Sequence, residues 1–181
     1  FSTSSCLREE AFVSGLNRYL PKDISVRGAR RVEDGFDARR QARSREYLYQ
    51  VFNRSTRRPL LVDRAYWIKQ PLDAMAMSRA AQSLEGRHDF RVFAAPLGRR
   101  SPLRTMYRSQ VVRSGLLFLF HFEAESFLPQ QVRRTVGALV EVGCGRMSMD
   151  QWSALLRGSG GACPTAPAWG LCLRNVKYAV D

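Results

Sequence analysis

The sequence predicts an α+β protein whose main part is a ferredoxin-like antiparallel sheet with helices on one face. Two observations carry this prediction. Short segments alternate apolar and polar residues, as half-buried strands do, and helix-capping residues precede the amphipathic segments between them. From residue 46 onward the elements follow in the order β-α-β-β-α-(α)-β, which is the split βαβ arrangement of ferredoxin-like domains.

Residues 1–30 are predicted to be the remnant of a second, similar α/β domain on the N-terminal side. Ser5 is a suitable N-cap for a helix that runs to about Leu20, because Leu16 and Leu20 lie on one helical face. Residues 23–27 alternate apolar and polar side chains and therefore predict a strand.

Residues 31–45 are predicted to be a basic connector between the two domains. This segment is rich in arginine, and Phe36 is its only large apolar side chain. Composition alone leaves two interpretations open. The segment is either a solvated linker or a strap that faces RNA.

The main domain is predicted to cover residues 46–181. Its expected strands are 46–53, a short segment at 65–68, the hairpin arms 104–113 and 116–124, and a last strand at 171–180. Its expected helices run from Asp73 to Leu84, from Pro129 to Val142, and onward from a capping box at Ser148. Turns or loops are expected at 86–90, 94–103 and 158–167, the last of them flexible.

The composition points to a polyanionic partner and excludes several classes of protein. The chain has 29 Lys and Arg residues against 16 Asp and Glu, which gives a net charge of +13, and nucleic acid is the simplest partner for such a charge. The longest apolar run, residues 116–120, is far too short to span a bilayer. Four scattered cysteines and two histidines make a zinc site improbable and indicate free thiols. We therefore expect an intracellular, reducing compartment, with the cytoplasm favoured over an organelle.

One arginine has an unusual position in the predicted helix 129–142. Arg133 lies on an otherwise apolar face beside Val132 and Val136. A guanidinium buried there needs a carboxylate or phosphate partner. No acidic residue occupies a suitable helical step on that face, so the partner must come from elsewhere. The common nucleotide-binding, metalloprotease and serine-hydrolase motifs are absent from the sequence.

Six segments in register resemble one family over nearly the whole chain, the TruA family of tRNA pseudouridine synthases. The matching segments are Leu16-Asn17-Arg18-Tyr19-Leu20-Pro21-Lys22-Asp23-Ile24, Phe36-Asp37-Ala38-Arg39, Arg45-Glu46-Tyr47-Leu48-Tyr49, Gly86-Arg87-His88-Asp89-Phe90, Phe127 with Val132-Arg133, and Gly170-Leu171-Cys172-Leu173.

The resemblance implies the pseudouridine synthase fold and an isomerase activity. Members of the family convert uridine to pseudouridine in the anticodon stem-loop of tRNA, without cofactor or metal, through a nucleophilic aspartate and a flipped base. By this resemblance, Tyr47 is the tyrosine that stacks on the flipped base, and Arg133 is the buried arginine that pairs with the aspartate. Family members are homodimers. If the protein is incomplete, we expect a partner to cover it instead, and in neither case do we expect a membrane.

The remaining arginines are expected to hold tRNA or another structured RNA by its phosphates. Arg39 falls on a basic position that lines the RNA cleft of the family. The candidate RNA-binding residues are Arg39, Arg43, Arg45, Arg99, Arg100 and Arg104.

The chain departs from the family pattern at the nucleophile. The family motif Gly-Arg-Thr-Asp-x-Gly-Val-His is absent, and Arg104-Thr105 is followed by Met106. Family order places the motif just upstream of Phe1, so we expect this chain to be a C-terminal part that is inactive alone. One alternative is a noncatalytic RNA-binding protein of the same fold, such as a component of a ribosome or RNA-processing particle. An RRM-like module is less favoured, because residues 116–122 lack the Lys/Arg-Gly-Phe start of its RNA-binding strand.

Overall fold

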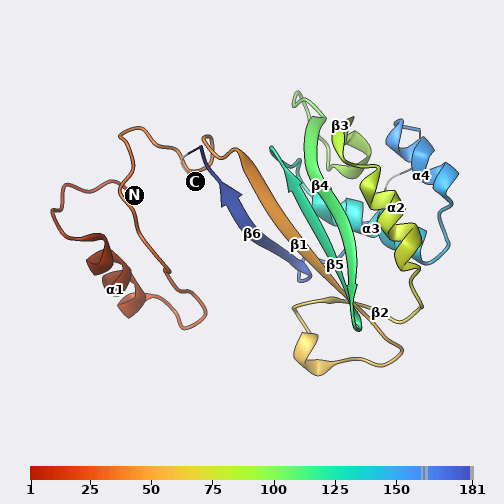
Figure 1. Cartoon of the computed structure of the whole chain (residues 1–181), viewed down its shortest axis with the longest axis horizontal. Coiled ribbons are helices and arrows are strands. Elements are labelled where there is room, and N and C mark those ends of the chain that lie inside the picture. Colours follow the sequence, from red (N-terminus) through yellow and green to blue (C-terminus); the bar gives the residue numbers. More distant parts are fainter. Residues whose placement is uncertain (160, 162, 180–181) are drawn as a thin grey trace. The chain divides into compact units, whose positions relative to one another are not determined.

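The computed structural model of the chain describes residues 1–159, 161 and 163–179 (Figure 1). Contacts divide the chain into two compact units, Phe1–Gln41 and Ala42–Asp181.

The first unit contains one helix, α1 (Glu9–Tyr19), within its described residues. The predicted start at Ser5 is wrong, because the Ser5 hydroxyl accepts a hydrogen bond from the Leu7 amide (3.3 Å) in a local turn instead of capping the helix. The acidic residues Glu9 and Glu10 occupy the first turn, where their negative charges interact favourably with the positive end of the helix dipole. The helix ends at Tyr19 with Leu20 as its C-cap, within one residue of the predicted end.

The strand predicted at residues 23–27 does not form. The side chain of Asn17 takes the place of a neighbouring strand. Its Nδ2 donates to the carbonyl of Val26 (2.8 Å), and its Oδ1 accepts from the amide of Val26 (2.7 Å). Farther along, the Asp37 carboxylate accepts hydrogen bonds from the amides of Arg39 and Arg40 at 2.8 and 2.9 Å, so this part of the connector is a local turn.

The second unit is a six-stranded sheet with three helices, which confirms the predicted α+β class. The strands are β1 (Ser44–Asn53), β2 (Tyr66–Ile68), β3 (Gly86–Asp89), β4 (Leu103–Ser114), β5 (Leu117–Ala124) and β6 (Leu171–Lys177). The helices are α2 (Ala74–Gln82), α3 (Gln131–Gly143) and α4 (Met149–Leu156), with short 3₁₀ turns at Pro59–Leu61 and Arg91–Phe93. Strands β6, β1, β5 and β4 lie side by side in that order, with helices following β1 and β5, as in a split βαβ domain.

Strand β1 is an inner strand of the sheet and pairs along both of its edges. One edge pairs antiparallel with β5, from Arg45 opposite Ala124 to Phe52 opposite Leu117. The other edge is shared between β6, which is antiparallel, and β2. The prediction of a purely antiparallel sheet is wrong for β2, which runs parallel to β1. The chain leaves β1, crosses over through residues 54–65 and re-enters in the same direction.

Strand β3 occupies the segment predicted to be a turn. Gly86, with a φ of 100°, follows α2, and the next residues pair antiparallel with β4 as far as Asp89 opposite Leu103. This strand is short, polar and at the sheet edge, so it lacks the alternation that reveals a half-buried strand. Asp89 accepts a hydrogen bond from the Arg91 amide (2.8 Å), as expected for this residue.

The hydrophobic core lies between the sheet and the helices α2, α3 and α4, which Figure 1 shows on one face of the sheet. Phe118, Phe120 and Phe122 of β5 point into this layer and are fully buried. Trp152 of α4 is also buried, and its indole N–H donates to the Ser83 hydroxyl (2.8 Å). No helix in the described part of the chain is long and apolar enough to cross a bilayer.

The predicted loop at 158–167 is only partly described, since residues 160 and 162 lie outside the described set. Its second half is not a loose linker. Cys163 and Ala166 are buried, and the Ala166 amide donates to the carbonyl of Arg133 (3.1 Å). The final strand ends at Lys177 and not at residue 180, which the structure does not describe.

Candidate active site

Tyr47 and Phe127 form an aromatic pair near one end of the sheet. Tyr47 projects from β1 toward the helix-covered face, where it packs against the edge of the core. Phe127 belongs to the connection between β5 and α3, and its ring lies edge-on to that of Tyr47 with 5.1 Å between the centroids. Both side chains are half-buried. An edge-on pair of this kind holds each ring in a defined orientation.

Helix α3 carries Arg133 in its first turn. The helix begins after Gln130, whose φ of 62° is left-handed, and the Gln131 side chain accepts a hydrogen bond from the Leu128 amide (2.7 Å). Arg133 is half-buried, and its Nε donates to the carbonyl of Ala166 (2.7 Å). Within residues 1–159, 161 and 163–179, no carboxylate lies within ion-pair distance of its guanidinium.

Tyr49 is the neighbour of Arg133 on β1 and is completely buried. Its hydroxyl donates to the carbonyl of Pro167 (2.7 Å). Burial raises the pKa of Tyr49 far above its usual value, the nearby Tyr66 raises it further, and the positive charge of Arg133 lowers it in part. Tyr49 is therefore a neutral hydrogen-bond donor at every physiological pH.

The surroundings of Arg133 suit the binding of an anion. The Nε of Arg133 is already bonded to a backbone carbonyl, which fixes the plane of the guanidinium. Its two terminal nitrogens can still donate a bidentate pair of hydrogen bonds to a carboxylate or phosphate. The ring of Tyr47 offers a surface on which a base can stack.

The structure gives different surroundings to the arginines predicted to bind RNA. Arg43, Arg99 and Arg100 are exposed. Arg45 donates from Nη1 to the carbonyls of Ala42 (2.9 Å) and Glu125 (2.7 Å), so it ties the start of β1 to the segment before Phe127. 

Arg104 and Arg39 complete that set. Arg104 lies at the start of β4, and its side chain turns back along the chain, where Nη1 donates to the carbonyls of Ser101 (3.0 Å) and Leu103 (2.5 Å). Arg39 is exposed in the first unit. In the second unit, strand register places Arg45 opposite Ala124, and Ala124 opposite Met106, so Arg45 and Arg104 lie toward the same end of the sheet as Tyr47.

Two features were missed by reasoning from the sequence. Tyr49 shares a strand face with Tyr47, and this alternation was the signal that could have placed it beside the site. The guanidinium of Arg57 lies 5.0 Å from the ring centroid of Trp67, in a basic loop at the far end of β1. An arginine-rich loop followed by a tryptophan was the corresponding signal there.

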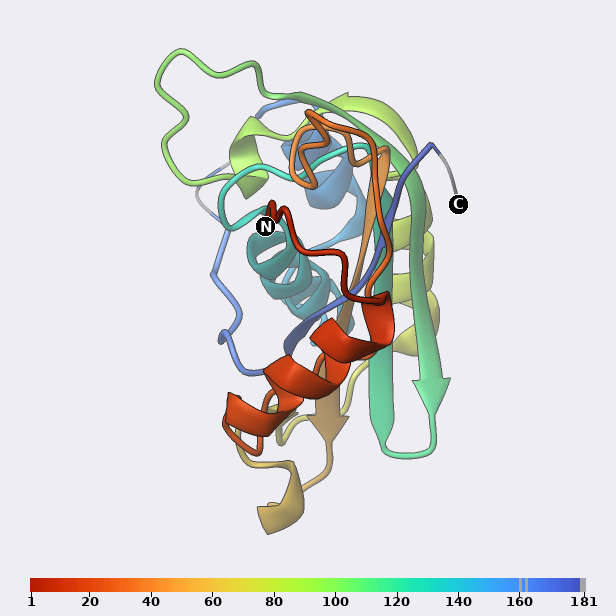
Figure 2. The ribbon, with the colours of Figure 1, turned by 90° about the vertical axis from the view of Figure 1, so that its left-hand side faces the viewer.

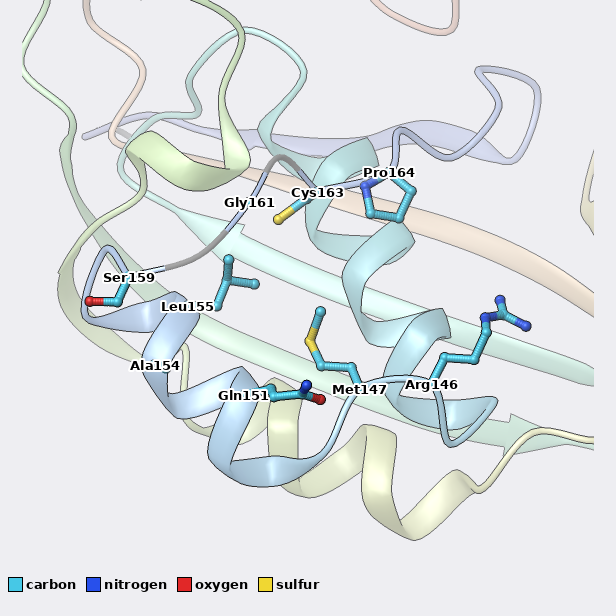
Figure 3. A pocket seen from close by; sticks show the side chains of 9 residues that line it. All are labelled: Arg146, Met147, Gln151, Ala154, Leu155, Ser159, Gly161, Cys163 and Pro164. Carbon is cyan, nitrogen blue, oxygen red and sulfur yellow. The ribbon is translucent and has the colours of Figure 1, made fainter.

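A pocket of about 310 Å³ lies apart from these residues, between α4 and a lining that includes Ser159, Gly161, Cys163 and Pro164. Figure 3 shows Met147 and Leu155 pointing into it from one side and Cys163 from the other. Burial raises the pKa of the Cys163 thiol to about 11, with a small opposing effect of Arg134. The thiol is therefore protonated at neutral pH and is a poor nucleophile. Tyr47, Phe127 and Arg133 do not line this pocket.

Together, these features define a basic α+β protein of ferredoxin-like topology, with an aromatic pair at one end of β1 and an arginine oriented by a backbone bond in the first turn of α3. The described residues contain no group of three or more His, Cys, Asp or Glu side chains suited to a metal ion.

Comparison with known proteins identifies the family. The model of the tRNA pseudouridine synthase family matches residues 80–179, and this chain belongs to that family. The tRNA pseudouridine synthase A of Bordetella petrii is 41% identical over 174 residues, covering 94% of this chain and 65% of that protein. The enzyme of the same name from Bordetella parapertussis is 40% identical over 177 residues, covering 96% and 66%. That of Brucella ovis is 45% identical over 161 residues, covering 86% and 63%. The chain therefore spans a little under two thirds of the length of these relatives.

Proposed function

We propose that the complete protein isomerises uridine to pseudouridine in the anticodon stem-loop of tRNA. Its relatives are named tRNA pseudouridine synthase A, and the anticodon stem-loop is the substrate that the family resemblance implies. The observation that carries the proposal is the state of Arg133, whose Nε is bonded to a backbone carbonyl while its terminal nitrogens point to no carboxylate among the described residues. A guanidinium held in this way is prepared for a carboxylate partner, which the residues described by the structure do not supply.

In this proposal each site residue has one role. Arg133 pairs with the nucleophilic aspartate, which residues outside this chain contribute, and holds its carboxylate in the charged form. Tyr47 stacks on the flipped uracil and takes part in removing its C5 proton. Phe127 keeps the Tyr47 ring in place through the edge-on contact of 5.1 Å. No metal or cofactor has a role.

The basic surface of the second unit would hold the tRNA backbone. Arg43, Arg99 and Arg100 are exposed, and such arginines bind phosphates without reading sequence. Arg45 and Arg104 use part of their donors on backbone carbonyls, so their contribution to RNA binding is smaller. Arg39 adds a phosphate contact from the connector.

The test measures pseudouridine in tRNA after incubation with the complete protein, by mass spectrometry of the digested RNA. We expect Arg133→Ala to abolish turnover while tRNA binding persists. Arg157→Ala removes an exposed arginine beyond α4 and is the matched control. Wild-type turnover in the Arg133→Ala variant would contradict the site assignment.

A second candidate function is a noncatalytic RNA-binding protein of the same fold. It is favoured by the net charge of +13 together with the absence of a carboxylate near Arg133 in the described part of the chain. This candidate predicts salt-sensitive RNA binding with no pseudouridine formed by the complete protein. The same mass-spectrometric measurement separates the two functions.

We also propose a homodimer in the cytoplasm as the working form of the complete protein. Residues 1–30 then form part of a second α/β domain, and residues 31–45 connect it to the main domain. Sedimentation of the complete protein tests the dimer.

A further inference from the structure

We propose that Tyr49 is a positioning residue for Arg133 and acts through residues 163–170, which we call the strap. This inference rests on the proposed function, because it assigns to Tyr49 a part in preparing the same site. In this role Tyr49 does not contact the substrate. Its hydroxyl instead fixes the backbone segment that fixes the guanidinium.

Hydrogen bonds connect the strap to both neighbouring elements. Arg133 of α3 makes a reciprocal pair with Ala166, since its Nε donates to the Ala166 carbonyl (2.7 Å) and its own carbonyl accepts from the Ala166 amide (3.1 Å). The next residue, Pro167, accepts the hydrogen bond of the Tyr49 hydroxyl (2.7 Å). The carbonyl of Gly170 accepts from the amide of Gln50 (2.9 Å). Strand β1 and helix α3 therefore hold the strap from two sides.

Two glycines allow the strap to lie this close. A Cβ built on Gly137 of α3 would be 1.9 Å from the carbonyl oxygen of Pro164, which no side chain can tolerate. A Cβ on Gly170 would be 2.7 Å from the ring of Tyr49. Direct backbone contact at both positions leaves the strap little freedom to move, and this is what a rigid support for a catalytic side chain requires.

Removing the Tyr49 hydroxyl would leave the Pro167 carbonyl without its donor beside a buried ring. An unsatisfied buried carbonyl tends to turn toward another donor or toward water. Ala166 is adjacent, so its carbonyl would turn as well, and the Nε of Arg133 would lose a well-oriented acceptor. The guanidinium would then sample several orientations, and the bidentate contact with a carboxylate would form less often.

The decisive variant is Tyr49→Phe in the complete protein, which removes one oxygen and keeps the ring. The first measurement is the hydrogen exchange of the Arg133 Nε–H by NMR, and we expect at least tenfold faster exchange. The second is steady-state turnover, for which we expect kcat to fall about tenfold with KM for tRNA unchanged. Tyr107→Phe is the matched control, because Tyr107 is half-exposed on β4.

Gly137→Ala tests the same support by another route. The added methyl group pushes the strap away from α3 near Pro164, so we expect faster Arg133 Nε–H exchange and lower kcat than in the wild type. Gly28→Ala is its control, because a Cβ there meets nothing within 4 Å. 

The outcomes separate this inference from the proposed function. Unchanged Nε–H exchange in folded Tyr49→Phe protein would overturn the positioning role, whatever the activity. Faster exchange with normal kcat would also overturn it. If the wild-type complete protein makes no pseudouridine, the proposed function fails, while the exchange measurement still decides whether Tyr49 orients Arg133.

A separate observation supports a second inference, at the opposite end of β1. We infer that the loop between β1 and β2, with Trp67 at its base, binds RNA phosphates. Arg57 lies over the Trp67 ring at 5.0 Å, and the indole N–H donates to the carbonyl of Arg54 (2.9 Å). These contacts give the loop a fixed base.

The loop gathers cations that have no carboxylate partner in the described structure. All of these cations are exposed, and the only acidic residue among them, Asp63, pairs with none. They are Arg54, Arg57, Arg58 and Arg64 of the loop, with Lys69 directly after β2. Uncompensated like charges repel one another, and a polyanion relieves that repulsion. The predominance of arginine and the stacked indole favour RNA over an acidic protein.

The loop is too far from Tyr47 to belong to the same contact. Tyr47 and Asn53 are six residues apart on an extended strand, which places the loop roughly 20 Å away along β1. Figure 2 shows this loop and the β4–β5 turn at one end of the sheet, and residues 94–102 at the other. We expect a whole tRNA to reach both ends, and a hairpin trimmed to two or three base pairs to reach only the end that carries Tyr47.

The test compares an Arg57→Ala/Arg58→Ala variant of the complete protein on whole tRNA and on a short anticodon hairpin. We expect about tenfold weaker binding of tRNA, a salt slope smaller in magnitude by roughly one to two, and unchanged hairpin binding. The matched control is Arg40→Ala/Arg146→Ala, which removes two cations that are paired with Asp37 and Glu141. Equal tRNA affinity in variant and wild type would overturn the inference. An equal loss of polyglutamate binding would overturn the assignment to RNA.

Discussion

The ring of Tyr47 lies edge-on to the ring of Phe127, with 5.1 Å between their centroids and 87° between their planes. Strand β1 supplies one ring, and the connection that leads into α3 supplies the other. The same connection precedes Arg133 by a few residues, so one segment of the chain orients both the stacking surface and the guanidinium.

Replacing Phe127 by Leu should therefore affect the site more than the fold. The edge-on contact is lost, Tyr47 gains rotational freedom, and the complete protein should lose about tenfold in kcat/KM on tRNA. Tyr107→Leu changes a half-exposed aromatic residue of β4 and serves as the control. A Phe127→Leu enzyme with unaltered kcat/KM would show that the pair is only packing.

Gly143→Ala should destabilise the fold at the contact between α2 and α3. A Cβ at Gly143 would be 2.7 Å from Sδ of Met77 and 3.3 Å from Cδ2 of Leu72, inside a packed core. We expect a loss of about 1–3 kcal/mol in the free energy of unfolding, measured by urea titration. The control Gly28→Ala introduces the same methyl group into open space. Equal urea midpoints for the two variants would mean that Met77 and Leu72 can move aside to accommodate the added methyl group.

Asp73→Ala should remove the N-cap of α2. The Asp73 carboxylate accepts hydrogen bonds from the amides of Met75 and Ala76, both at 2.9 Å. Their loss should cost about 1 kcal/mol of unfolding free energy, because two amides of the first turn lose their acceptor. Asp23→Ala is the comparison, in an exposed position of the first unit. A shift in the urea midpoint no larger than that of Asp23→Ala would contradict the capping role.

Glu123 should make stability depend on pH. Hydrogen bonds from Lys177 (2.8 Å) and Ser44 (2.6 Å) lower the pKa of its carboxyl in the folded state, and burial opposes them in part. The folded pKa lies below the unfolded one, so this contribution is complete above the unfolded pKa, near pH 4.5, and is lost as the pH falls through the folded pKa.

The corresponding measurement is the unfolding free energy of the wild type and Glu123→Gln at pH 7 and at pH 3. The wild type should be the more stable of the two at pH 7, and the difference should shrink at pH 3. A difference that stays constant with pH would show that the carboxylate charge contributes nothing.

The strands and helices that bury one face could be predicted from the sequence, because their buried apolar residues recur with the period of the strand or the helix. Phe118, Phe120 and Phe122 alternate along the predicted strand 116–124, and all three lie in the core. The capping box at Ser148 and Gln151 forms with both of its hydrogen bonds, at 2.8 and 3.2 Å. Here local chemistry and tertiary structure agree.

Elements decided by partners elsewhere in the chain could not be predicted in this way. The apolar alternation at residues 23–27 indicates a strand, yet Asn17 takes both hydrogen-bonding groups of Val26. Strand β3 has no apolar alternation, and only its pairing with β4 makes it a strand. Arg133 was singled out by its apolar surroundings, but its bond to Ala166 depends on a close approach at Gly137 that no local pattern encodes.

The bond between Arg133 and Ala166 joins residues 33 positions apart and so closes a long loop that contains α4. The entropy of closing such a loop rises only with the logarithm of its length, so doubling the length costs only about 0.6 kcal/mol. Extra residues inserted after Gly158 should therefore leave the guanidinium where it is. The position of the Arg133 guanidinium therefore depends on the residues that make the contacts, Ala166 and Gly137 among them. It depends very little on the number of residues in the loop that these contacts close.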